Sequence, residues 1–111
     1  RGLACCHTVT SLADGTLVGN QVEVSMVRTV GWHLSGDAVT SPGDGQTSLQ
    51  AVKKLDFDTS RMTSGVVVRC QQTGRLEVFV KGSYEQIQKI SVSDSVPEDY
   101  EATTRLCARN G

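Results

Sequence analysis

TSGVVVRCQQTGRLEVFVK, residues 63–81, is the stretch that decides the fold. Thr63–Cys70 and Arg75–Lys81 are rich in β-branched residues, which favour extended strands. Gln71–Gly74 lies between them as a short polar segment that ends in glycine, which is typical of a β-hairpin turn. The second strand sends alternate residues to opposite faces of the sheet: Leu76, Val78 and Val80 to one, Glu77, Phe79 and Lys81 to the other.

The N-terminal third of the chain predicts mainly helix. Gly2–Val9 contains few helix breakers and predicts one or two helical turns, whereas Gln21–Gly31 predicts a longer helix. Asn20 is a suitable N-cap for that helix, because its side-chain oxygen can accept from the first backbone amides. The apolar stripe expected on this helix consists of Val22, Met26 and Val30.

The remaining segments extend the sheet and add two further helices. Residues 35–48 are rich in Gly, Ser, Asp, Thr and Pro, so we expect a flexible surface loop there. Ala51–Phe57 predicts a third antiparallel strand. Gly82-Ser83 is expected to cap a short helix that runs to about Ile90, and a last helix is expected from Ser95 to the end of the sequence. The fold class that follows is α+β, a twisted antiparallel β-sheet flanked by helices.

Composition excludes several classes of function. The 111 residues are enough for a single domain, residues 1–111, with one core. A net charge of -1 provides no positive field for nucleic acid, and no apolar run is long enough to span a bilayer. No serine, histidine and aspartate pattern of a hydrolase occurs, so we expect no catalytic residue in this chain. The absence of an initial Met favours a piece cut from a longer protein.

The four cysteines predict neither a metal site nor a disulfide framework. Cys5 and Cys6 are adjacent, and Cys70 and Cys107 are far from them, so no pair has zinc-site spacing. Reduced, half-buried thiols are the expectation. A secreted, disulfide-stapled domain is the disfavoured alternative. The neighbouring His7 is expected to be a structural residue.

Three segments of the sequence share an order and spacing with a known family. They are GNQVEVSM at 19–26, LDFDTSRMTSGVV at 55–67 and VFVKGSYEQI at 78–87. Together they resemble the nucleotide-binding domain of P-type cation-transporting ATPases. That family has a Gly-Asp/Glu-x-x-Glu helix start, then a Phe-x-Phe strand that runs into Arg-Met-Ser-Val, then a Val-Lys-Gly-Ala/Ser-Pro-Glu turn.

Further residues are similar to the type-V branch, whose pumps are associated with polyamines or undefined substrates. They are ACCHTVT at 4–10, the Gly31-Trp32 pair, and Val96-Pro97 followed by Tyr100. The sequence departs from the family pattern at Asn20, where an acidic residue is common, and at Tyr84, where proline is usual. The stretch from Phe57 to Met62 is also shorter than in calcium and proton pumps, which weakens the match of Arg61 to their lysine.

The resemblance implies a nucleotide site formed by seven residues, namely Phe57, Lys81, Gly82, Glu23, Arg61, Met62 and Ser83. It implies that Phe57 stacks on adenine, that Lys81 lies at the floor of the adenine pocket, and that the glycine after it lets the backbone approach the ligand. Glu23 would accept from the exocyclic amine, Arg61 would neutralise the phosphates, and Met62 would pack beside the base. The alternatives from the residues alone are that Phe57 and Met62 are core residues of their strand, that Lys81 is a surface lysine, and that Glu23 is a helix-dipole partner.

The implied function is that of an ATP-binding domain in a larger membrane pump. Such a domain presents ATP to an aspartate in an Asp-Lys-Thr-Gly-Thr motif, which this sequence lacks. Mg²⁺ would be bound through the phosphorylation domain, and the phosphorylation and actuator domains of the same parent chain would be the partners. The domain would lie on the cytoplasmic side of a membrane, without turnover of its own. The alternative is a nucleotide-free regulatory or interaction module on the same fold.

Overall fold

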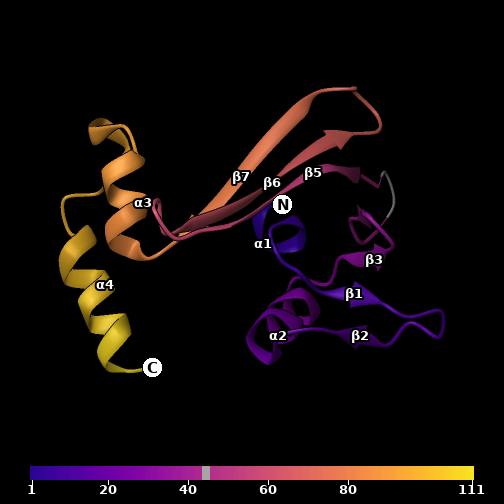
Figure 1. Ribbon diagram of the computed structural model, residues 1–111, viewed down its shortest axis with the longest axis horizontal. Helices are drawn as coiled ribbons and strands as arrows, with labels where there is room; N and C mark the ends of the chain where they lie inside the picture. The colour runs from indigo at the N-terminus through magenta and orange to yellow at the C-terminus, as the bar shows by residue number, and fades with distance from the viewer. Residues whose placement is uncertain (44–45) are drawn as a thin grey trace.

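The structure is a computed structural model that describes residues 1–43 and 46–111. Within these residues, the main feature is a five-stranded antiparallel sheet with the order β3-β4-β5-β6-β7 (Figure 1). Its strands are β3 His33–Ser35, β4 Ala38–Thr40, β5 Ser48–Asp58, β6 Thr63–Cys70 and β7 Leu76–Gly82. The α+β fold predicted from the sequence is thereby confirmed.

The β6–β7 hairpin has the predicted turn and a register that fixes which residues share a face. Gly74 closes the turn with a φ of 71°, a conformation that glycine adopts at little cost. Val66 lies opposite Phe79 and Ser64 lies opposite Lys81 across the two strands. Because Val66 is buried, Phe79 and Lys81 also point to the inner face of the sheet. Alternate residues of β7, such as Val78, therefore point outward and are exposed.

The N-terminal elements cover that inner face. They are α1 Gly2–Cys5, the small β1 Thr10–Ser11 and β2 Leu17–Val18 sheet, and α2 Gln21–Val30. Asn20 caps α2 as predicted, because its side chain accepts from the backbone amides of Val22 and Glu23. Gly31 ends the helix in the left-handed conformation.

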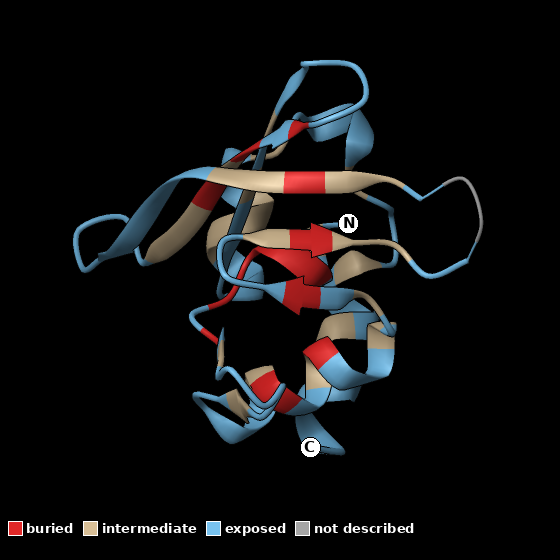
Figure 2. Ribbon diagram, turned by 90° about the vertical axis from the view of Figure 1, so that its right-hand side faces the viewer, coloured by how far each residue is buried: buried red, intermediate tan, exposed pale blue. Residues whose placement is uncertain are grey.

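The core lies between α1, α2 and the inner face of the sheet, as the buried positions in Figure 2 show. Its largest fully buried side chains are Leu49, Val9, Val66 and Val68. The stripe predicted for α2 is wrong in part, because Val30 is half-buried against the core but is not at the centre of the buried face. Val24 and Val27 are the buried residues, whereas Val22 is 77% exposed. Helical periodicity alone fits both stripes, and the packing of α2 against α1 selects the second one.

The C-terminal helices lie at one end of the sheet, beyond β7 (Figure 1). They are α3 Tyr84–Ile90, the 3-10 turn η1 Ser93–Ser95 and α4 Tyr100–Arg109. Ser83 caps α3 by accepting from the backbone amide of Gln86, as expected. The last helix begins later than predicted, at Tyr100, because Ser95 ends the 3-10 turn and residues 96–99 form a bend and a turn. None of these described helices contains a buried residue.

The segment 35–48, predicted as a loop, is more regular than expected. It contains β4, which pairs with both β3 and the start of β5. The backbone amide of Ser41 donates to the carbonyl oxygen of Thr47 (2.8 Å), which closes the connection between β4 and β5. Residues 44 and 45 of the predicted loop lie outside the described residues. Among the helices of the described part, none has the length and apolarity needed to cross a bilayer.

Candidate functional site

A hollow of about 270 Å³ opens between the sheet and the loop that follows α1. Its wall is formed by Cys6, His7 and Thr8 from that loop, residues 54–57 of β5, Ser64 and Gly65 of β6, and Lys81 of β7. We call it the Phe57 hollow. Two of the seven residues predicted for the nucleotide site, Phe57 and Lys81, line it from different strands. Phe57 is 58% exposed, so its ring is open to a ligand and is not part of the core.

A β-bulge aims Phe57 into this hollow. Leu55 pairs with Gly65 and Asp58 pairs with Thr63, so β5 has two residues where β6 has only Ser64. Such an extra residue interrupts the alternation of faces and redirects a side chain. Strict alternation would place Phe57 on the face opposite to Lys54, whereas the extra residue allows its side chain to turn toward the hollow that both of them line. The sequence predicts only a regular strand at Ala51–Phe57 and gives no sign of the bulge.

An ion pair links the strand-ending lysine to helix α2. Lys81 Nζ contacts Glu23 Oε1, while Glu23 Oε2 accepts from the backbone amide (3.1 Å) and hydroxyl (2.9 Å) of Thr8. Burial raises the pKa of Glu23, but the bonds from Lys81 and Thr8 outweigh it and lower the pKa to about 2. Both carboxylate oxygens are engaged, so Glu23 joins α2, the loop after α1, and β7 beside the hollow.

His7 is held as a neutral imidazole at the back of the hollow. The backbone amide of Val9 donates to its Nδ1 (3.1 Å), and its Nε2 lies 2.8 Å from the carbonyl oxygen of Ala4. Since Nδ1 accepts, Nε2 must carry the proton. Burial lowers the pKa of His7, which favours this neutral form. Both ring nitrogens are committed to the backbone, so the expected structural role fits the geometry.

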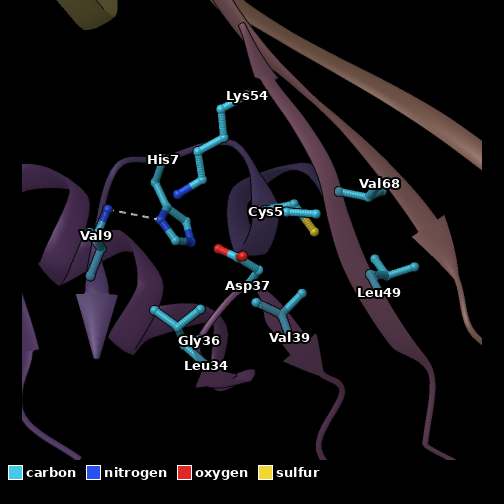
Figure 3. Close-up of a pocket in the computed structure, with 11 residues that line it drawn as sticks. Cys5, His7, Val9, Leu34, Gly36, Asp37, Val39, Leu49, Lys54 and Val68 are labelled. Carbon is cyan, nitrogen blue, oxygen red and sulfur yellow. Dashed lines mark hydrogen bonds between the residues drawn. The ribbon is translucent and has the colours of Figure 1, made fainter. Parts of the chain in front are cut away.

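A second, smaller cavity of about 20 Å³ lies behind His7, enough for roughly one water molecule (Figure 3). Lys54 and Asp37 extend toward His7 from β5 and from the β3–β4 turn. Apolar residues that include Leu49 and Val68 form its other side. Within residues 1–43 and 46–111, no group of three or more His, Cys, Asp or Glu side chains is arranged to hold a metal ion.

Arg61 and Met62 lie in the β5–β6 turn, outside the lining of the Phe57 hollow. The carboxylate of Asp58 organises this turn by accepting from the backbone amides of Ser60 (2.8 Å) and Arg61 (3.3 Å). The side chain of Arg61 is 81% exposed, and its Nε lies 3.9 Å from Asp58 Oδ2. Met62 is 46% exposed and has a φ of 55°, so it is a turn residue and not a buried strand residue.

Gly82 and Ser83 have structural partners in the protein itself. A Cβ on Gly82 would lie 3.0 Å from the carbonyl oxygen of Met62 and 3.0 Å from Thr63 Cγ2. The missing Cβ thus allows β6 and β7 to approach each other, which accounts for glycine at this position without a ligand. Ser83 is used as the cap of α3. The residues that sequence reasoning missed are Lys54, Thr8 and Ser64, whose place in the hollow depends on strand register.

Comparison with known proteins gives relatives of one kind. No protein-family model matches the chain. It is 28% identical over 122 residues to human "Polyamine-transporting ATPase 13A2", a match that covers 90% of this chain and 10% of the relative. It is 25% identical over 134 residues to "Cation-transporting ATPase catp-5" of Caenorhabditis elegans, covering 97% of this chain and 11% of the relative.

The chain is homologous to a segment of P-type cation-transporting ATPases. The mouse "Probable cation-transporting ATPase 13A5" is a further relative, 22% identical over 93% of this chain. The chain spans about a tenth of the length of these relatives. The resemblance inferred from the three segments is therefore confirmed at the level of the family, and these relatives are consistent with the type-V branch.

Proposed function

We propose that this P-type ATPase segment is the domain that binds ATP, with the adenine in the Phe57 hollow. The observation that supports it best is the bulge, which brings an exposed aromatic ring and Lys81 to one hollow from two different strands. An exposed ring beside a polar wall is a suitable stacking platform, and such stacking contributes about 1–3 kcal/mol per base. Core packing would not require this exposure.

The size of the hollow matches part of a nucleotide. Pockets that bury most of a drug-sized ligand have volumes of roughly 300–1,000 Å³. The Phe57 hollow, at about 270 Å³, is slightly smaller. It therefore suits the base and sugar, with the phosphates extending toward solvent. In the parent protein, that direction would present the γ-phosphate to an aspartate of the phosphorylation domain, where Mg²⁺ would also be bound.

The ion pair between Glu23 and Lys81 opposes nucleotide binding, because it must be broken at least in part before Lys81 can contact the ligand. Once released, Lys81 can extend along an adenosine. Glu23, still held by Thr8, would then accept from the exocyclic amine of adenine. Stacking and these exchanged contacts must also offset the entropy of ordering the ligand. We accordingly expect millimolar to high-micromolar affinity, about -4 to -6 kcal/mol.

The parent protein would be a membrane pump that transports a cation, with this domain on the cytoplasmic side. Its actuator and phosphorylation domains would be the partners of the segment.

A second candidate function is that of a nucleotide-free interaction module. It is favoured by the apolar outer face of β7, where Leu76, Val78 and Val80 are 57%, 58% and 44% exposed, because exposed apolar patches often mark contact surfaces.

Titration of the 111-residue chain with ATP, followed by amide chemical shifts, separates the two candidates. Phe57→Ala should weaken binding about 5-fold or more, because it removes the stacking platform. Lys81→Ala should also weaken it, whereas Lys89→Ala, which removes a lysine from α3, should leave it within about twofold. An unsaturable response of the wild-type chain, or equal affinity of Phe57→Ala and wild type, would refute nucleotide binding in this hollow.

A further inference from the structure

We propose that Lys54 contacts the phosphate chain of the bound nucleotide, the role that the sequence resemblance assigns to Arg61. The inference rests on the proposed nucleotide function. It concerns a residue that the family resemblance does not mark, and it adds a prediction about which part of the ligand each cation recognises.

Strand register places Lys54 on the correct face. It pairs with Val66, whose side chain is buried on the inner face, so Lys54 also points inward. Lys54 lines the Phe57 hollow on β5, three residues before the ring. In Figure 3 its side chain extends from β5 toward His7, at the wall that the hollow shares with the smaller cavity. The neighbouring Lys53 pairs with Val67 and points to the outer face.

The charges around the hollow single out Lys54 as the available cation. Lys81 is engaged by Glu23. Among the described residues, no carboxylate oxygen lies within 4.0 Å of the Lys54 ammonium. Two carboxylates are nearby without pairing to it: Asp37 lines the smaller cavity, and Asp56 lines the Phe57 hollow. The imidazole of His7 is neutral and offers no competing charge.

Arg61 is a poor candidate for the same task. Arg61 borders two cavities that include the outward-pointing Val80, and Lys54 lines one of them as well, but of these two cations only Lys54 also lines the Phe57 hollow. The side chain of Arg61 also lies near Asp58 in its own turn. With adenine on Phe57, the phosphates need a cation on the inner face. A lysine ammonium is a compact charge on a flexible stem, so Lys54 can follow a phosphate chain that extends toward solvent.

The test compares ligands that differ only in their phosphates. Wild type, Lys54→Met, Lys54→Arg and Lys53→Met are titrated with adenosine, ADP and ATP without added metal, by amide chemical shifts. Methionine keeps the apolar stem and removes the charge. Lys53→Met makes the same change in net charge on the opposite face. We expect Lys54→Met to weaken ATP about 3- to 10-fold and adenosine by less than about twofold. Lys54→Arg should restore most of the ATP affinity, and Lys53→Met should stay within about twofold for all three ligands.

The outcomes distinguish this inference from the proposed function. If wild type binds ATP but Lys54→Met and Lys53→Met bind it equally well, Lys54 does not contact the phosphates. Equal weakening of adenosine and ATP by Lys54→Met would also overturn the inference, because the phosphates would not be what the lysine recognises. If wild type binds neither adenosine nor ATP, the proposed function itself fails. Both lysines are exposed, so thermal melting should show that all three variants fold.

Discussion

The Glu23–Lys81 ion pair makes stability depend on pH in a way that can be calculated. The pKa of Glu23 falls from its ordinary 4.5 to about 2, which corresponds to at most about 3.4 kcal/mol, since one pKa unit is about 1.36 kcal/mol. The Lys81 side chain is 44% exposed and that of Glu23 is 15% exposed, so solvent screening reduces the contribution. We expect Glu23→Gln to lower the free energy of unfolding by about 1–2 kcal/mol at pH 7.

The sign of the pH dependence follows from the direction of the shift. A carboxyl group whose folded pKa is lowered stabilises the protein fully above its unfolded pKa, here about 4.5. That contribution is lost as the pH falls toward the folded value of about 2. The difference between wild type and Glu23→Gln should therefore be full at pH 7, decrease below about pH 4.5, and nearly vanish at about pH 2.

Urea unfolding of both proteins at several pH values measures this difference. Glu98→Gln is the matched control, because Glu98 is exposed and takes part in no ion pair among the described residues. It should change the free energy of unfolding by less than about 0.5 kcal/mol at every pH. A cost of Glu23→Gln that is the same at pH 2.5 and pH 7 would refute the reasoning, since the lost interaction would then not be the ionised pair.

Two further predictions concern the core and the sheet. Val24→Ala should lower the free energy of unfolding by roughly 2 kcal/mol, because Val24 is buried. Val22→Ala, on the exposed side of α2, should lower it by less than about 0.5 kcal/mol. Equal losses for the two variants in urea unfolding would show that α2 packs differently. Gly65→Ala should cost about 1–3 kcal/mol, because the new Cβ would lie 2.8 Å from the carbonyl oxygen of Phe79. An unchanged melting temperature for Gly65→Ala would contradict the close approach of β6 and β7.

Features set by local chemistry could be predicted from the sequence. The turn at Gln71–Gly74, the cap at Asn20 and the cap at Ser83 each depend on residues within a few positions of each other. The structure has all three where they were expected. Local hydrogen bonding and backbone freedom are sufficient to specify such features.

Features that depend on packing between distant segments could not be predicted. The stripe of Val22, Met26 and Val30 has good helical spacing, but contact with α1 buries Val24 and Val27, leaves Val30 only half-buried and leaves Val22 exposed. The loop expected at 35–48 contains β4, because Ala38–Thr40 pairs with β5 and buries Val39, although the polar composition of the whole segment favours a loop.

In the candidate site too, some features could be predicted from local motifs and others depend on strand register. Phe57 and Lys81 were proposed from the motifs, and the structure places both at one hollow. The bulge that aims Phe57 inward has no marker in the sequence, and neither has the inward direction of Lys54, which depends on a second register shift between Ala51 and Lys53. Whether the seven proposed residues bind nucleotide stays a prediction.

The absence of buried side chains from α3, η1 and α4 has a consequence for measurements on this chain. Helices that bury little apolar surface open locally at a free energy far below that of global unfolding. The hydroxyl of Tyr100 donates to the carbonyl oxygen of Tyr84 (2.7 Å), which ties α4 to α3. Amide protons after Gly82 should thus exchange with solvent orders of magnitude faster than those of the sheet, and proteases should cut there first. The cooperative unit is the part of the chain that carries the hollow.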